Sequence, residues 1–184
     1  MIRSCLFIII IPLLAIACKQ VVNPNQHPLQ QSPDSSYRDV RYRDQQHIEK
    51  VIFAFCEHFD NGELVRCMEY MTDSIHGEID GIKILGKQNW GDKITRLYSS
   101  AQSKHFQTRH ILSNMQYFTG ANDTVKVSMY ASVLWTDLES GQIQLMSVGY
   151  YKGKMVKREN KWLIAELNSL PDSRLVKYYY HDQQ

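Results

Sequence analysis

Apolar residues follow a helical period in the first half of the foldable region. Between residues 47 and 59 they stand three or four positions apart, which predicts an amphipathic helix with Asp44 as its N-cap. The same reasoning predicts a short second helix over 63–71 and a strand over 72–81. A third helix is expected to begin just after Gly86. This half of the region is therefore mainly helical.

After about residue 104 the apolar period changes to two, which predicts strands. The expected strands cover 108–118, 124–136, 142–158 and 162–168, and the third has a candidate bulge at Gly153. Short polar turns separate them. The order of elements predicts an α+β fold in which three N-terminal helices pack in a curved antiparallel sheet.

The N-terminus carries a different pattern. One arginine precedes an apolar run from Leu6 to Ala17, which is too short to span a bilayer as a helix and has the layout of a secretory signal. Its end, AIAC, resembles the bacterial lipoprotein signal, in which the cysteine is lipidated. We therefore expect a signal peptide over 1–17, lipidation of Cys18, and a cell-envelope protein facing the periplasm or the exterior. An ordinary signal peptide cut near Ala17 and a retained anchor helix are the alternatives.

Composition divides the rest of the chain. Residues 18–43 are rich in proline and amides and are expected to form a flexible tether to the lipid anchor. The folded domain is expected over 44–170, with a C-terminal tail at 171–184. The chain has 21 basic and 19 acidic residues without a clustered basic stretch, so nucleic acid is not an expected partner.

The cysteine pattern does not indicate a metal site. Cys56 and Cys67 lack the spacing of zinc ligands, and we favour two buried free thiols over a disulfide between them. The sequence also lacks a glycine-rich phosphate loop and a metalloprotease helix motif. We therefore expect neither a metal nor a cofactor.

Four segments, in order and at matching spacing, resemble the SnoaL-like branch of the nuclear transport factor 2 (NTF2) superfamily between residues 44 and 168. They are HFDNGEL (58–64), ILGKQNW (84–90), TRHILSN (108–114) and YYKGKMVKRENKWLI (150–164). The resemblance implies an NTF2-like, cone-shaped domain around an apolar pocket. Members of the branch include dehydratases, polyketide cyclases and isomerases, and also binding and assembly modules, so the fold does not decide the function.

The resemblance implies that Asp60 and His110 meet across the pocket as the catalytic pair of a dehydratase. Chemically, a carboxylate on one ring nitrogen fixes the tautomer and leaves the other nitrogen to accept a proton. Two positions depart from the dehydratase pattern, because Trp135 stands where a second histidine is expected and Phe59 where a tyrosine is expected. Tyr117, Tyr130, Tyr150 and Tyr151 are the candidate replacements for the missing proton donor.

Each candidate also has a structural interpretation. His110 could be a core histidine that bonds Asp60, and Asp60 could bond backbone amides at a helix end. Strand alternation places Arg109 on the opposite face from His110, and Asn114 on the same face. The predicted ligand-binding residues are Trp90, Asn114, Trp135 and Tyr151.

Three functions follow from these patterns. The first is binding of a small apolar or aromatic molecule. The second is a cofactor-free lyase or isomerase reaction with His110 as the base. The third is an envelope assembly role, including a homodimer formed through the outer sheet face.

Overall fold

The computed structural model describes residues 40–172. The predicted signal peptide, Cys18 and nearly all of the predicted tether lie outside the described residues, as does the tail from residue 173. Within the described range no helix has the length and apolarity needed to cross a membrane.

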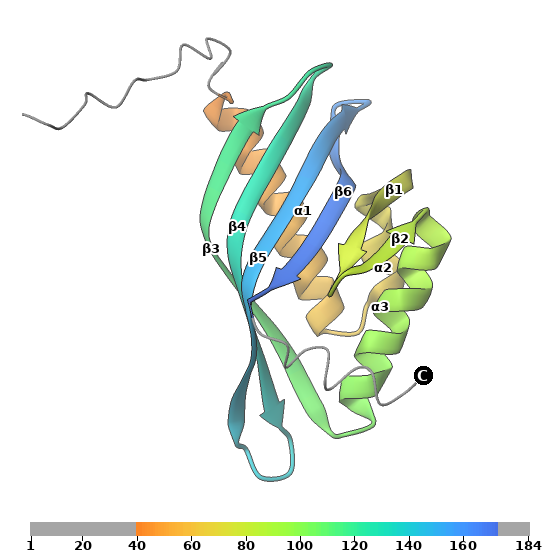
Figure 1. Cartoon of the computed structure of the whole chain (residues 1–184), viewed down its shortest axis with the longest axis vertical. Helices are drawn as coiled ribbons and strands as arrows, with labels where there is room; N and C mark the ends of the chain where they lie inside the picture. The colour runs from red at the N-terminus through yellow and green to blue at the C-terminus, as the bar shows by residue number, and fades with distance from the viewer. Residues whose placement is uncertain (1–39, 173–184) are drawn as a thin grey trace, which may run out of the picture. The chain divides into compact units, whose positions relative to one another are not determined.

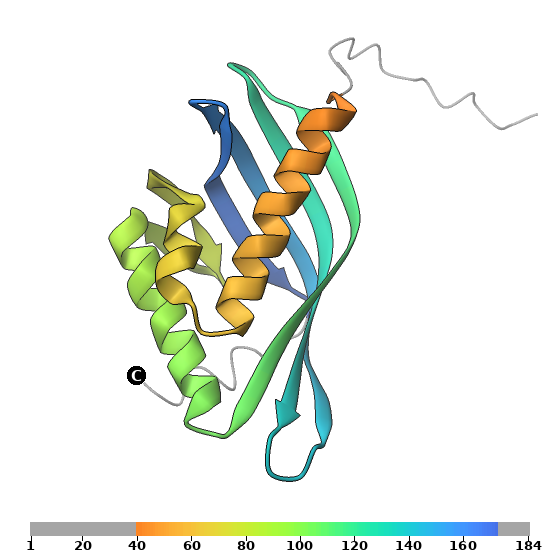
Figure 2. The ribbon, with the colours of Figure 1, turned by 180° about the vertical axis from the view of Figure 1, so that it is seen from behind.

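The described residues form an α+β domain, which confirms the expected fold class (Figure 1). Its elements are α1 (Tyr42–Asp60), α2 (Leu64–Glu69), β1 (Met71–Ile79), β2 (Ile82–Leu85), α3 (Lys87–Gln102), β3 (Phe106–Thr119), β4 (Thr124–Asp137), β5 (Ile143–Arg158) and β6 (Lys161–Pro171). The six strands form one sheet in the order β2-β1-β6-β5-β4-β3. Helix α1 crosses one face of the curved sheet, and α2 and α3 lie beside the β1–β2 hairpin (Figure 2).

The sheet is mixed, so the expectation of a purely antiparallel sheet was wrong. Strand β1 pairs with β6 in parallel, and all other pairs are antiparallel. Gly77 permits the parallel pairing because a Cβ at this position, where φ is +148°, would collide with the backbone of Leu167. Strand β2 had no prediction of its own, since four residues are too few to show a period.

Helix α1 buries one stripe of side chains against the sheet, as its apolar spacing predicts. Ile48, Ile52 and Phe55 belong to the main core. Asp44 is not the N-cap: the helix begins at Tyr42, and Asp44 lies buried in its first turn. There its carboxylate accepts hydrogen bonds from Lys157 on β5 and Trp162 on β6.

The second predicted helix proved shorter than expected. It ends at Glu69, and Met71 already begins β1. Val65 is exposed, and Cys67 is the residue that α2 buries. The third helix begins directly after Gly86, as predicted, and buries Trp90 and Ile94.

Shifts in the pairing register change which residues share a face of the sheet. In β3, Asn114 and Met115 together oppose one residue of β4, and Asn114 has a φ of +53°. The expected bulge at Gly153 is absent, because Gly153 pairs in register with Val127 and Leu167. The shift in the β5–β6 pair follows instead between Lys154 and Met155.

The core fills the space between α1 and the sheet. It is formed mainly by Ile48, Ile52, Met71, Ile75, Trp90, Val127, Met129 and Met155. On β4 the alternation from Val125 to Trp135 points inward as predicted. The face of the sheet opposite α1 exposes Ile111, Leu145 and Val148, and the homodimer alternative depends on this face.

Candidate ligand-binding site

Asp60 and His110 form a direct, buried pair. Asp60 is the last residue of α1, and His110 lies on the edge strand β3. The imidazole Nδ1 and Asp60 Oδ1 are 2.6 Å apart, and the backbone N–H of His110 donates to Oδ2 at 2.8 Å. The side chain of His110 is 10% exposed, and that of Asp60 is 8% exposed. Because a carboxylate oxygen only accepts, Nδ1 carries a hydrogen, and in the neutral imidazole Nε2 is then the acceptor.

The end of α1 is held to β3 by further bonds. Gln107 and Arg109 both donate to the backbone carbonyl of Asp60, at 2.5 and 3.3 Å. These bonds satisfy a carbonyl that the end of a helix leaves without an intrahelical partner. Arg109 therefore reaches the site around the edge of the sheet, although alternation places it on the opposite strand face from His110.

Aromatic rings surround the imidazole. Phe59 packs edge-on against His110 with ring centroids 5.4 Å apart, and Tyr151 of β5 lies at 6.0 Å. Tyr98 of α3 contacts the far side of Phe59 at 6.1 Å. Tyr98 was not among the candidates from the sequence, because nothing in its local pattern distinguishes its phenol from a core side chain.

A surface depression of about 470 Å³ opens on this pair. Its lining is Phe53, Cys56, Glu57, Asp60, Asn61, Arg109, His110 and Leu112. The volume lies within the range typical of sites for small molecules. The depression combines apolar side chains with polar and charged ones, so it can hold a small molecule that carries both kinds of group.

The interior of the cone is almost filled. The enclosed void between α1 and strands β4–β6 measures about 20 Å³, enough for about one water molecule. Phe55, Val127, Met155 and Tyr151 are among its lining residues, and neither Asp60 nor His110 is. The expected apolar hollow shared by both groups is therefore not found among the described residues, and the two meet in the more open depression.

The predicted ligand-binding residues are distributed over three regions. Trp90 lies in the main core, and Trp135 stacks on Phe106 in a second, smaller core cluster. Asn114 is exposed and lines a separate depression beside Tyr130 and Tyr150. It does not share the face of His110, because the bulge shifts the alternation of β3 at this residue. Only Tyr151 lies close to the imidazole.

The four tyrosines proposed as proton donors also lie in different regions of the domain. Tyr117 donates its hydroxyl to Glu49 of α1, which together with burial raises the pKa of the phenol. Tyr130 and Tyr150 pack against each other beside Asn114. Tyr151 therefore remains as the candidate among the four, and Tyr98 joins it.

The remaining reactive groups do not form a site of their own. Cys56 and Cys67 are buried free thiols, as favoured from the sequence. Burial raises the pKa of both, that of Cys67 to about 12, so they are protonated at neutral pH. Within residues 40–172, no group of three or more His, Cys, Asp or Glu side chains is arranged to hold a metal ion.

The sequence model for the SnoaL-like domain matches residues 40–168, which is most of the chain. The chain belongs to the SnoaL-like domain family. The pairing of α1 and β3 through Asp60 and His110 is thus part of a SnoaL-like domain. Among curated proteins, none matches the chain significantly in sequence.

Solved structures share the fold of this SnoaL-like domain at low sequence identity. A proposed scytalone dehydratase from Novosphingobium aromaticivorans has 13% identity and a TM-score of 0.61, covering 71% of this chain and 85% of its own. The protein Aln2 from a Streptomyces species has 12% identity and a TM-score of 0.66, and the match covers 76% of this chain and 98% of Aln2. A type 2 hexachlorocyclohexane dehydrochlorinase has 17% identity and a TM-score of 0.60, and the match covers 71% of this chain and 86% of the dehydrochlorinase. These similarities establish the NTF2-like fold.

Proposed function

We propose that the protein binds a small apolar or aromatic molecule in the depression over Asp60 and His110. One observation carries the proposal: a buried imidazole, held by a carboxylate at Nδ1, lines a depression of ligand size. Phe53 and Leu112 line the depression as apolar residues, and Nε2 of His110 would supply one hydrogen-bond acceptor. A ligand with an aromatic body and one hydroxyl group matches this set of partners.

The arrangement favours selective binding because the imidazole is preorganised. Asp60 fixes both the ring orientation and the tautomer, so the ligand does not have to order them. Nε2 has no hydrogen-bond partner among the described residues. A ligand hydroxyl that donates to this nitrogen would satisfy the acceptor.

Calorimetric titration with 2-naphthol tests the proposal. Replacing His110 by Gln retains an amide that can donate to Asp60 but removes the second ring nitrogen, so we expect affinity to fall about tenfold. His105→Gln is the matched control, since that histidine is exposed on a turn and outside the depression. Equal affinity of His110→Gln and wild type, or a Kd above about 1 mM for wild type, would contradict the proposal.

A second candidate function is a cofactor-free lyase or isomerase reaction in the same depression. The observation that favours it is the 2.6 Å contact between Nδ1 and Asp60, which would stabilise an imidazolium formed when Nε2 removes a proton from a substrate. Tyr98 and Tyr151 are the candidate proton donors, and neither is among the residues that line the depression. A dehydrochlorinase and a proposed dehydratase share the fold, which supports this candidate without deciding it.

We also propose that the protein is exported and anchored to a membrane by a lipid on Cys18. The support is the sequence alone: a short apolar run that ends in AIAC at residues 15–18. A tether of about 25 residues would give the domain freedom to move relative to the membrane.

A further inference from the structure

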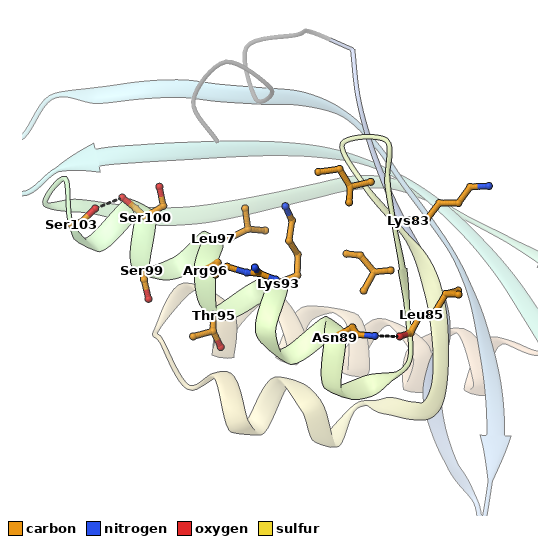
Figure 3. A pocket seen from close by; sticks show the side chains of 12 residues that line it. Lys83, Leu85, Asn89, Lys93, Thr95, Arg96, Leu97, Ser99, Ser100 and Ser103 are labelled. Carbon is orange, nitrogen blue, oxygen red and sulfur yellow. Dashed lines mark hydrogen bonds between the residues drawn. The ribbon is translucent and has the colours of Figure 1, made fainter. Parts of the chain in front are cut away.

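A second cavity formed by the described residues lies away from Asp60 and His110. It measures about 710 Å³ and separates strand β2 from helix α3 (Figure 3). Its residues come from Ile82–Leu85 of β2 and from the stretch of α3 and its end between Asn89 and Ser103. It shares no lining residue with the depression over the His110 imidazole.

The polar side of this cavity is positively charged. Lys83, Lys93 and Arg96 line it, and no carboxylate does so. Lys93 and Arg96 stand three residues apart on one face of α3, which brings two cations together. Neither forms a salt bridge with a residue of the described range. Burial and the nearby charge of Arg96 lower the pKa of Lys93, and the charge of Asp80 opposes this effect.

A buried hydroxyl group lines the same cavity. Ser100 is 5% exposed, and its Oγ has no hydrogen-bond partner among the described residues. Buried polar groups in proteins are nearly always bonded, so an unpartnered one indicates a missing partner. Ser100 is four residues after Arg96, on the same face of the helix, where an acceptor held by the two cations would come within reach.

The lining also has an apolar part, beside the polar side chains of Asn89, Thr95, Ser99 and Ser103. Ile82 and Ile84 of β2 and Leu97 of α3 are among the residues that line the cavity. A fully hydrated inorganic ion would leave these side chains without contact. The cavity therefore combines a charged group for an anion with an apolar surface for the body that carries it.

We propose that the cleft between β2 and α3 binds a small amphipathic anion, an organic carboxylate or phosphate ester. Its charged group lies between Lys93 and Arg96 and accepts a hydrogen bond from Ser100. Its apolar part packs against Ile84 and Leu97. The bound anion neutralises two cations that otherwise repel each other, and it satisfies the Ser100 hydroxyl.

Calorimetric titration of the full-length chain with four probes tests this proposal. Benzoate and phenyl phosphate carry both required features, benzyl alcohol lacks the charge, and inorganic phosphate lacks the apolar body. We expect at least one of the two organic anions to bind about tenfold more tightly than either of the other probes, as charge-assisted hydrogen bonds imply. Which of the two binds more tightly distinguishes a carboxylate site from a phosphate site.

Variants locate the binding. Lys93→Met keeps the length of the side chain, and we expect it to weaken binding of the preferred anion about tenfold; Arg96→Gln and Ser100→Ala should weaken it less. Lys126→Met, on the exposed side of β4, is the matched control and should bind as wild type does. Equal binding of benzyl alcohol and both organic anions, or equal affinity of Lys93→Met and Lys126→Met, would overturn the proposal.

Discussion

At the scale of single residues, Asp60 has a structural and a chemical role at once. Its two carboxylate oxygens bond the backbone and the ring of the same histidine, and its own carbonyl accepts from Gln107 and Arg109. Asp60 was interpreted from the sequence both as a helix-end residue and as the partner of His110, and the two interpretations apply to different atoms. The carbonyl ends the helix, and the carboxylate orients the imidazole.

This double role predicts a large loss of stability for Asp60→Ala. The substitution leaves a buried N–H and the ring Nδ1 of His110 without a partner, which should lower the free energy of unfolding by about 3 kcal/mol. Asp73→Ala is the matched control, because Asp73 is fully exposed and should change stability by less than about 0.5 kcal/mol. Urea denaturation measures both. A loss below about 1 kcal/mol for Asp60→Ala would show that the pair does not fasten α1 to β3.

At the scale of secondary-structure elements, Asp44 connects helix α1 with strands β5 and β6. Lys157 on β5 and Trp162 on β6 both donate to this carboxylate of α1. Burial alone would raise the pKa of Asp44, but the hydrogen bonds and the positive charge of Lys157 outweigh it, and the pKa lies below its usual 3.8.

A lowered carboxyl pKa gives a defined pH dependence. The ionised form stabilises the fold, so the contribution of Asp44 is constant above pH 5 and disappears as the pH falls below 3.8 and through the folded-state pKa. We expect the difference in unfolding free energy between wild type and Asp44→Asn to be constant from pH 5 to 7. It should shrink below about pH 4, as measured by urea denaturation at each pH. A difference that grows toward acid would contradict this assignment.

The same elements show what local patterns could predict. The predictions of helix α3 and strand β4 were confirmed, because the apolar residues of each element are regularly spaced and face the core. Asn114 was placed on the wrong face because a bulge adds one residue to the period, and the bulge depends on the pairing with β4. Aspartate is a common N-cap residue, which is why Asp44 was predicted as one. Its buried position depends on hydrogen bonds from Lys157 and Trp162, which are distant in the sequence.

At the scale of the whole molecule, the fold class and the family followed from the sequence, and the meeting of Asp60 with His110 followed from the family resemblance. The parallel pairing of β1 with β6 did not, because it joins segments about ninety residues apart whose local patterns do not name their partner. The filling of the cone could not be predicted either. It depends on how the side chains of α1 and three strands pack together.

The lipoprotein proposal also concerns the whole molecule. We expect Cys18→Ser to move the protein from the membrane fraction to the soluble fraction, because the substituted residue cannot accept the lipid. Cys67→Ser is a control, since that thiol lies buried in α2 and should leave membrane attachment unchanged. Fractionation followed by immunoblotting measures the distribution. Membrane attachment of Cys18→Ser equal to that of wild type would refute the anchor.

The most direct test of the account is to identify the small molecules that the protein retains during purification. Mass spectrometry of the full-length wild type, His110→Gln and His105→Gln should reveal an apolar or aromatic compound that wild type and His105→Gln carry and that His110→Gln has lost. Identical profiles for all three proteins would contradict a ligand site built on Asp60 and His110.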